Sequence, residues 1–165
     1  MFKKIVVVAL LALPFGIFAQ DKIAYVNTQE VMIAMPETKA MQAELEKMQK
    51  QIETEVKTLE DEFSKKYQAF AQQQDTLVES IKIRRATELN EIRQRAESYQ
   101  QDSQQQLYAK QQELLTPIQK KLLDTIKLVG EENGYIYILE KSAFLFTAPN
   151  SIDATPLVKK KLGLQ

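Results

Sequence analysis

The feature that most constrains this chain is a stretch of 80 residues, 37–116, that contains neither glycine nor proline. Within it, large apolar side chains recur in steps of four, three and four residues, at Met41, Leu45, Met48, Ile52, Val56, Leu59, Phe63, Tyr67 and Phe70. These steps form an eleven-residue repeat of about 3.67 residues per turn, close to the period of a straight α-helix. The alternative, an ordinary amphipathic helix, would show a broader apolar face. The narrow stripe therefore favours a helix with one seam that packs against a partner.

One continuous helix over this stretch would be about 120 Å long, and the sequence favours a helical hairpin instead. The segment QQQDT at 72–76 interrupts the stripe. Thr76 and Glu79 then form a capping-box pattern, which predicts a second helix from Leu77. The chain is therefore expected to turn near 72–77.

A reversal near residue 75 or 76 predicts the register of the hairpin, because facing positions would then sum to about 151 or 152. Six of nine rungs pair apolar with apolar side chains in this register, and Tyr67 faces Arg84 or Arg85. The predicted arm seam comprises Met41, Leu45, Met48, Ile52, Val56, Leu59, Phe63, Phe70, Ile81, Leu89 and Ile92.

The segments on either side of the hairpin predict a small body. KIAYVN at 22–27 is typical of a short strand. Asn27 with Glu30 forms a capping box for a short helix through Met35, and Pro36 suits the first position of the next helix.

Beyond the hairpin, Pro117 predicts a kink in the second helix where the arm ends. Asn133-Gly134 is a helix stop, and the apolar runs of 135–148 flank Lys141-Ser142, which predicts a β-hairpin. Thr155 is expected to cap a last short helix, with Pro156 at its first position.

The predicted fold class is α+β, mostly α: a long antiparallel helical hairpin that projects from a small β body. The expected divisions are a signal peptide 1–20, a body segment 21–36, the arm 37–116, and a second body segment 117–165. A sheet of this size with apolar residues on both faces needs cover, so we expect an oligomer joined at the sheet. Its candidate residues are Tyr25, Val26, Ile136, Ile138, Phe144 and Phe146.

The N-terminus has the pattern of a secretory signal. Lys3 and Lys4 precede an apolar run from Ile5 to Leu13, and Ala19 supplies a small residue before a cut. An uncleaved membrane anchor is the alternative, but the apolar run is short for a spanning helix. We expect an exported chain that starts near Gln20 or Asp21.

Composition argues against several classes of function. Without Lys3 and Lys4, 20 basic and 22 acidic residues remain, a net charge of −2, whereas a nucleic-acid binder needs clustered excess basic residues. The sequence has no cysteine and no histidine, so it lacks a disulfide framework and the commonest general base and metal ligand. No enzymatic activity, metal or cofactor is expected.

The return helix carries the functional hint from the residues themselves. The run QQDSQQQ at 100–106 predicts a polar, loosely packed inner surface, either in a weakly specified coiled coil or in a flexible arm that lines a wet cavity. Residues 65–95 hold seven basic and four acidic side chains, a local charge of +3. This charge is either solvated or meets acidic clients or the headgroups of a membrane surface, through Lys82, Arg84, Arg85, Arg93 and Arg95.

The layout resembles the OmpH/Skp family of periplasmic chaperones. The most specific segments are YVNTQEV at 25–31, MPETK at 35–39, ENGYIYILEKS at 132–142 and PNSIDAT at 149–155. The resemblance implies a homotrimer with a shared β-barrel body, whose helical arms enclose a cavity. It also implies an ATP-independent holdase in the periplasm that keeps unfolded outer-membrane proteins soluble. The best-known members are strongly basic, unlike this chain, and no lipopolysaccharide motif maps onto its residues. The alternative is an exported coiled-coil oligomer that serves as a structural adaptor of the envelope.

Overall fold

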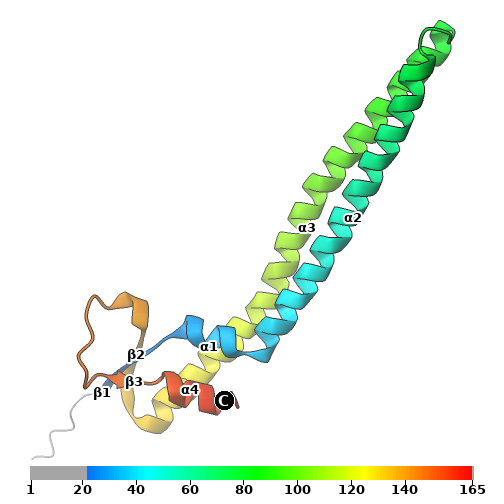
Figure 1. Cartoon of the computed structure of the whole chain (residues 1–165). Helices are drawn as coiled ribbons and strands as arrows, with labels where there is room; N and C mark the ends of the chain where they lie inside the picture. Colours follow the sequence, from blue (N-terminus) through cyan, green and yellow to red (C-terminus); the bar gives the residue numbers. More distant parts are fainter. Residues whose placement is uncertain (1–21, 165) are drawn as a thin grey trace, which may run out of the picture.

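The structure, a computed structural model, describes residues 22–164 and shows a long two-helix arm that projects from a small body (Figure 1). The predicted signal peptide lies outside the described residues. The elements in chain order are β1 (Lys22–Val26), α1 (Thr28–Ala34), α2 (Pro36–Gln73), α3 (Glu79–Asn133), β2 (Tyr135–Glu140), a 3₁₀ helix (Lys141–Ala143), β3 (Ile152–Asp153) and α4 (Thr155–Lys161). The predicted fold class, a helical hairpin on a small β body, is confirmed.

The body contains a parallel sheet of three strands in the order β2-β1-β3. Ala24 of β1 lies opposite Ile138 of β2 on one side and Ile152 of β3 on the other. Parallel neighbours need a long crossover connection, and here the whole arm is the connection from β1 to β2. The chain therefore leaves the body after β1, runs through the arm, and returns to form β2 in the same sheet.

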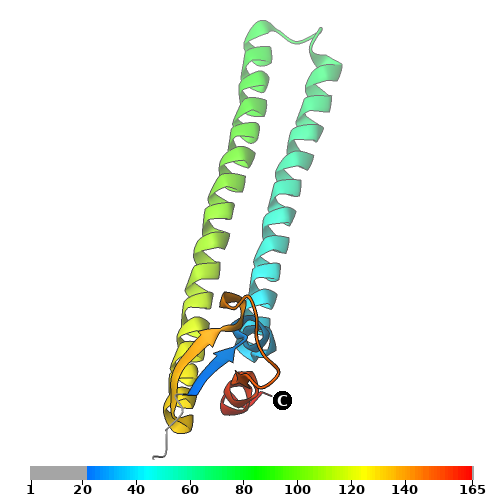
Figure 2. The same cartoon turned by 90° about the vertical axis from the view of Figure 1, so that its left-hand side faces the viewer.

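One face of the sheet packs on helices and forms the core of the body. In Figure 2, β1 and β2 lie in front of the last part of α3, with α4 beside them. The buried cluster joins all of these elements and comprises Val26, Val31, Met35, Ile118, Leu122, Val129 and Val158. Since three of these residues come from α3, the core fixes the base of the arm.

Three of the predicted helix boundaries are confirmed. The side chain of Asn27 accepts a hydrogen bond from the backbone N–H of Glu30 at 3.0 Å, which caps α1. Pro36 is the first residue of α2. Gly134 follows α3 with φ of 66°, a left-handed conformation that glycine adopts without steric cost.

The prediction of a β-hairpin over 135–148 is wrong. The chain runs from β2 into the 3₁₀ helix 141–143 and then follows an irregular path to β3, which pairs with β1. A two-residue hairpin turn favours Gly, Asn or Asp because it needs positive φ, and Lys141-Ser142 offers none of them. Phe144 and Phe146 consequently lie outside any strand.

Helix α3 continues through Pro117 as one element of 55 residues, so the arm and the body share a helix, as the sequence predicts. The kink at Pro117 stays a prediction. One local prediction in the second body segment differs from the structure. The hydroxyl of Thr155 accepts the backbone N–H of Asn27 at 3.0 Å, and does not cap α4. This bond ties α4 to the end of β1.

The tip of the arm differs from the predicted capping box. Helix α3 begins at Glu79 with Val78 as its N-cap residue, two residues later than predicted. Thr76 instead donates its hydroxyl hydrogen to the carbonyl of Gln73 at 2.9 Å and closes the end of α2. The turn occupies 74–78, which overlaps the predicted 72–77.

The contacts between the helices differ from the predicted register by two to seven positions. Contacts between the helices join Lys66 to Glu88, Phe63 to Arg93, and Glu37 to Lys121, pairs that sum to 154, 156 and 158. Helical side chains lean toward the N-terminus of their own helix. In an antiparallel pair, the side chains of the two helices lean in opposite directions along the arm. Each α2 side chain therefore contacts an α3 residue about two positions later in the sequence than the α3 residue at the same height. Long ion-pairing side chains reach further still.

The corrected register predicts which cysteine pair will crosslink. We expect the variant Ile52→Cys with Ser103→Cys to form an intramolecular disulfide, because both residues line one hollow between the helices. The pair Ile52→Cys with Tyr99→Cys, which fits the sum of 151, should crosslink more slowly. The chain has no native cysteine to interfere. Rates of oxidation on a non-reducing gel distinguish the two registers, and faster crosslinking to position 99 would restore the earlier one.

Candidate functional site

The structure places all eleven predicted seam residues of the arm in buried or half-buried positions. Leu59, Leu89 and Ile92 are buried, while the other eight keep part of their surface in contact with water. Tyr67 continues the stripe but is 53% exposed. Side chains in the seam are therefore fully buried at a few positions and partly exposed to water at most of them.

The open rungs form three neighbouring hollows along one side of the hairpin. A lower hollow of about 590 Å³ includes Ile52, Val56 and Leu107. A middle one of about 190 Å³ is lined by Leu59, Glu60, Phe63, Ile92, Arg93 and Ala96. An upper one of about 530 Å³ is lined by Phe63, Tyr67, Phe70, Ile83, Ala86, Thr87, Leu89, Asn90 and Arg93. Glu60 is common to the lower and middle hollows, and Phe63 and Arg93 to the middle and upper ones, so the three form one feature, the arm groove.

The groove exists because α3 presents small or polar side chains where α2 presents large ones. Ala86, Ala96 and Ser103 occupy α3 positions along the three hollows, and Ser103 is buried. Small residues leave the facing side chains without partner atoms, so the surface between the helices is concave. The Gln-rich run contributes Gln100 and Gln104 to the lower hollow, which gives that part the polar character expected from the sequence.

Aromatic side chains form the floor of the upper groove. The rings of Phe63 and Tyr67 stack with centroids 6.0 Å apart and an interplanar angle of 9°. The guanidinium carbon of Arg93 lies 5.4 Å from the centre of the Phe63 ring, a cation–π contact. Sequence reasoning placed Tyr67 against Arg84 or Arg85, but in the structure the cation is Arg93 and the ring is Phe63.

The opposite side of the upper arm is closed by an ion pair. Lys66 donates from its ammonium to Glu88 across the helices, and Glu62 lies 3.5 Å from the same ammonium. The hydrogen bond from Lys66, with its charge, lowers the pKa of Glu88 below the ordinary value of a glutamate. The groove therefore opens on one face of the arm, and charged side chains cover the other.

The five basic residues predicted to meet clients at the tip have different surroundings along α3. Arg84 and Arg85 lie near Glu88, where their charges also lower its pKa. Arg93 lies in the groove. Lys82 is half-buried and Arg95 is exposed. Among these five, Arg93 is therefore the one with a defined place in a concave surface of the described chain.

The outer face of the sheet is apolar and exposed in the single chain. Ile23, Ile136, Tyr137 and Leu139 all keep about half of their surface exposed, and Leu145 and Phe146 in the loop before β3 are exposed as well. Figure 1 shows this loop standing away from the helices of the body. Monomeric proteins rarely expose such contiguous apolar patches.

The predicted sheet interface residues divide into two groups in the structure. Val26 is buried in the core of the chain itself, and Ile138 is half-buried and packs against that core. Their assignment to an oligomer interface stays a prediction. Tyr25 is half-buried on the outer face, where the ring of Phe144 lies edge-on at 6.4 Å and the ammonium of Lys141 lies 5.8 Å from the ring centre. Ile136 and Phe146 are exposed.

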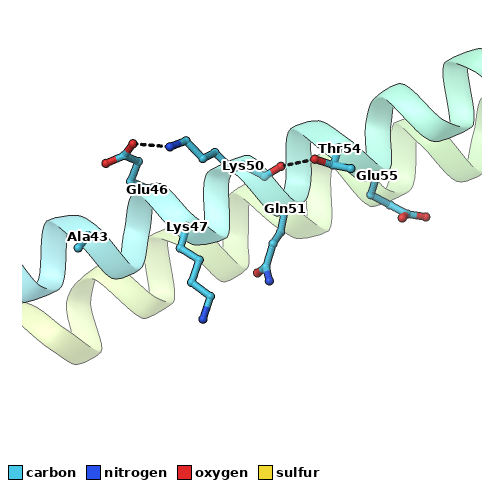
Figure 3. Close-up of a pocket in the computed structure, with 7 residues that line it drawn as sticks. All are labelled: Ala43, Glu46, Lys47, Lys50, Gln51, Thr54 and Glu55. Carbon is cyan, nitrogen blue, oxygen red and sulfur yellow. Dashed lines mark hydrogen bonds and ion pairs between the residues drawn. The ribbon is translucent and has the colours of Figure 1, made fainter.

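A further hollow of about 570 Å³ lies on α2 alone (Figure 3). Its lining is polar, with Lys50 bonded to Glu46 at 2.7 Å and accepting the hydroxyl of Thr54 on its carbonyl at 2.8 Å. These are i,i+4 contacts of a solvated helix face, so the hollow offers no arrangement for chemistry.

Residues 22–164 offer no group of three metal-ligating side chains of the His, Cys, Asp and Glu types. Over the same residues, no helix has the length and apolar character needed to span a membrane.

Sequence reasoning missed the one-sided character of the arm. Tyr67, Ile83 and Ala86 were not assigned to a site, nor was the ion pair between Lys66 and Glu88. The sequence does indicate the groove, because large apolar residues of the α2 stripe face small residues of α3, such as Ala86 and Ala96. Recognising these facing pairs requires the corrected register of the hairpin.

Comparison with known proteins places the whole described fold in one family. The family described as outer membrane protein (OmpH-like) matches residues 22–162. A Photorhabdus laumondii protein named chaperone protein Skp is 26% identical over 156 residues, which cover 91% of this chain and 92% of that protein. Its namesake from Photorhabdus luminescens is 26% identical over 141 residues, which cover 83% of each.

The fold is also that of a solved structure. The crystal structure of an OmpH-like protein from Caulobacter crescentus CB15 superposes with a TM-score of 0.78 at 18% identity, covering 87% of this chain and 85% of that one. This likeness concerns the fold, and the family match spans the body and both helices of the arm. The chain therefore belongs to the OmpH family, whose description is outer membrane protein (OmpH-like).

Proposed function

We propose that this chain is an ATP-independent holdase of the periplasm that binds unfolded outer-membrane proteins between its helical arms and keeps them soluble. The observation that carries the proposal is the arm groove, an apolar and water-accessible surface on a helical hairpin that projects from the body. Related proteins named chaperone protein Skp support the same function. An unfolded chain has no fixed shape, so a holder needs adaptable apolar contacts rather than a closed pocket.

The proposal includes a homo-oligomer joined at the outer face of the sheet. Ile23, Tyr137 and Leu139 are exposed there, and burial in an assembly would remove this apolar surface from water. The resemblance to the OmpH/Skp family favours three copies. Three arms around one client would multiply weak contacts through effective concentration.

Suppression of aggregation tests the holdase function. We expect the exported form of the chain to keep a urea-unfolded outer-membrane barrel protein soluble after dilution, in a discrete complex and without nucleotide. Light scattering measures aggregation, and size-exclusion chromatography detects the complex. Bovine serum albumin at equal mass is the control for crowding.

The competing proposal is a structural adaptor of the envelope without client binding. An adaptor would form the same oligomer but leave the barrel protein to aggregate at the rate seen with albumin. That result would remove the holdase function and leave the assembly intact.

A further inference from the structure

We infer that the arm groove grips the client as an extended segment, with apolar side chains at alternating positions and an acidic residue beside Arg93. This inference rests on the proposed holdase function and adds the gripping surface and the class of segment it takes.

The lining of the upper groove suits apolar side chains that arrive from water. Tyr67 and Ile83 are 53% and 59% exposed, and both line the upper hollow. Phe63 and Phe70 continue the same wall. Aromatic and aliphatic side chains in a concave surface gain dispersion contacts and lose water on binding.

The groove opens on a single face because of the helical geometry. Successive helical residues turn by about 100°, so Lys66 and Tyr67 flank the seam of α2 on opposite sides, as Glu88 and Leu89 flank the seam of α3. Tyr67 and Leu89 both line the upper hollow, while Lys66 bonds to Glu88. The upper hollow therefore lies on the side of the arm opposite the Lys66–Glu88 ion pair.

The spacing of the groove residues along the arm can accommodate an extended segment. At 1.5 Å per residue, Phe63 and Tyr67 lie about 6 Å apart along the arm, and Tyr67 and Phe70 about 4.5 Å. Side chains on one face of an extended chain repeat at about 6.7 Å, so two or three alternate residues can follow these rungs.

The charges along the groove complement a segment that carries both signs. Arg93 is the charged side chain in the lining of the upper hollow. The lower hollow is lined by Glu53, Glu60 and Asp61 against Lys57. An acidic residue of the client would lie near Arg93 and a basic residue near the lower hollow, and this sets the orientation of the segment.

A tryptophan reporter tests occupancy of the groove. The chain contains no tryptophan, so Tyr67→Trp supplies a single probe in the groove. Tyr108→Trp is the matched control, since Tyr108 is 65% exposed and is not among the residues that line the three hollows. The ligand is a tryptophan-free nonapeptide in which Leu and Tyr alternate with Ser, with one Asp in a Ser position. We expect a saturable blue shift from Tyr67→Trp and none from Tyr108→Trp.

Two comparisons test the class of segment. A peptide of the same composition with its apolar residues in one block should bind at least about fivefold more weakly, because its side chains miss alternate rungs. Replacing Asp by Lys in the peptide should weaken binding, and Arg93→Glu should reverse the preference. Equal affinity for all peptides would overturn the proposed class of segment.

Client holding is tested with a pair of variants that keep the fold. Tyr67→Ser should raise the protein concentration that half-suppresses aggregation of the unfolded barrel protein by about fivefold, whereas Tyr108→Ser should match the unchanged protein. Equal behaviour of the two variants, with the unchanged protein active, would overturn the groove and leave the holdase function standing.

The remaining outcomes separate the groove from the function on which it rests. If the unchanged protein does not suppress aggregation but the peptide shifts the Tyr67→Trp spectrum, the holdase function falls and the ligand class of the groove stands. A shift that depends on protein concentration without peptide would show that the arm of a second copy fills the groove, and would overturn the inference.

Discussion

Val31→Asp is expected to unfold the body of this protein at 37 °C. Val31 lies in α1 with 0% of its surface exposed, within the cluster that also holds Met35 and Val158. An unpaired carboxylate buried among apolar side chains costs several kcal/mol. That cost is a large part of the roughly 5–15 kcal/mol by which a domain is stable, so the variant should populate the unfolded state.

Ile33→Asp is the matched control for this prediction. It introduces the same side chain two positions later in the same helix, in place of another β-branched residue, but Ile33 is 61% exposed. Surface changes of this kind usually alter stability by less than about 0.5 kcal/mol. Thermal unfolding followed by circular dichroism compares the two. Equal melting temperatures for both variants would contradict the described core.

The helical arm was predictable because its signals are local. Residues 37–116 lack Gly and Pro, and an apolar stripe with a helical period needs no knowledge of distant residues. The cap at Asn27, the start at Pro36 and the stop at Gly134 are local for the same reason, since each depends on the backbone of one turn.

The sheet was predicted less well because its pairing is not local. Strand β1 pairs with residues 135–140 and 152–153, more than 100 positions away in sequence. Two adjacent apolar runs around Lys141-Ser142 suggest a hairpin when neighbours in sequence are taken as neighbours in the sheet. The second run instead leaves the sheet, and β3 takes its place beside β1.

The candidate site required both helices in place. The stripe of α2 identifies Phe63 and Phe70 as seam residues, but it does not say which side of the seam is open. That depends on Ala86 and Ala96 of α3 opposite them and on the ion pair between Lys66 and Glu88. A shifted register gives each α2 residue different partners on α3. The open face of the arm therefore could not be predicted from the sequence of one helix.

Assembly supplies the other large effect: Tyr137→Glu is expected to convert the proposed oligomer into a folded monomer. Tyr137 is 60% exposed on the outer face of the sheet, opposite Ile23 of β1. A glutamate there remains solvated in the single chain, so the core beneath it should be unaffected. If copies join through this face, each interface would bury the new charge without a partner, which costs about 2–5 kcal/mol per contact.

The measurement is the mass of the particle by light scattering at micromolar concentration, with circular dichroism to verify that the helices remain. Tyr108→Glu makes the same change at a similarly exposed tyrosine on the arm, and should keep the mass of the unchanged protein. The Tyr137→Glu variant should have the mass of one chain, because a loss of about 2–5 kcal/mol weakens an association by roughly 30- to several thousand-fold. An unchanged mass would mean that the outer face of the sheet stays exposed in the assembly. The oligomer would then form through other surfaces, and the arm groove is one apolar surface that a second copy could fill.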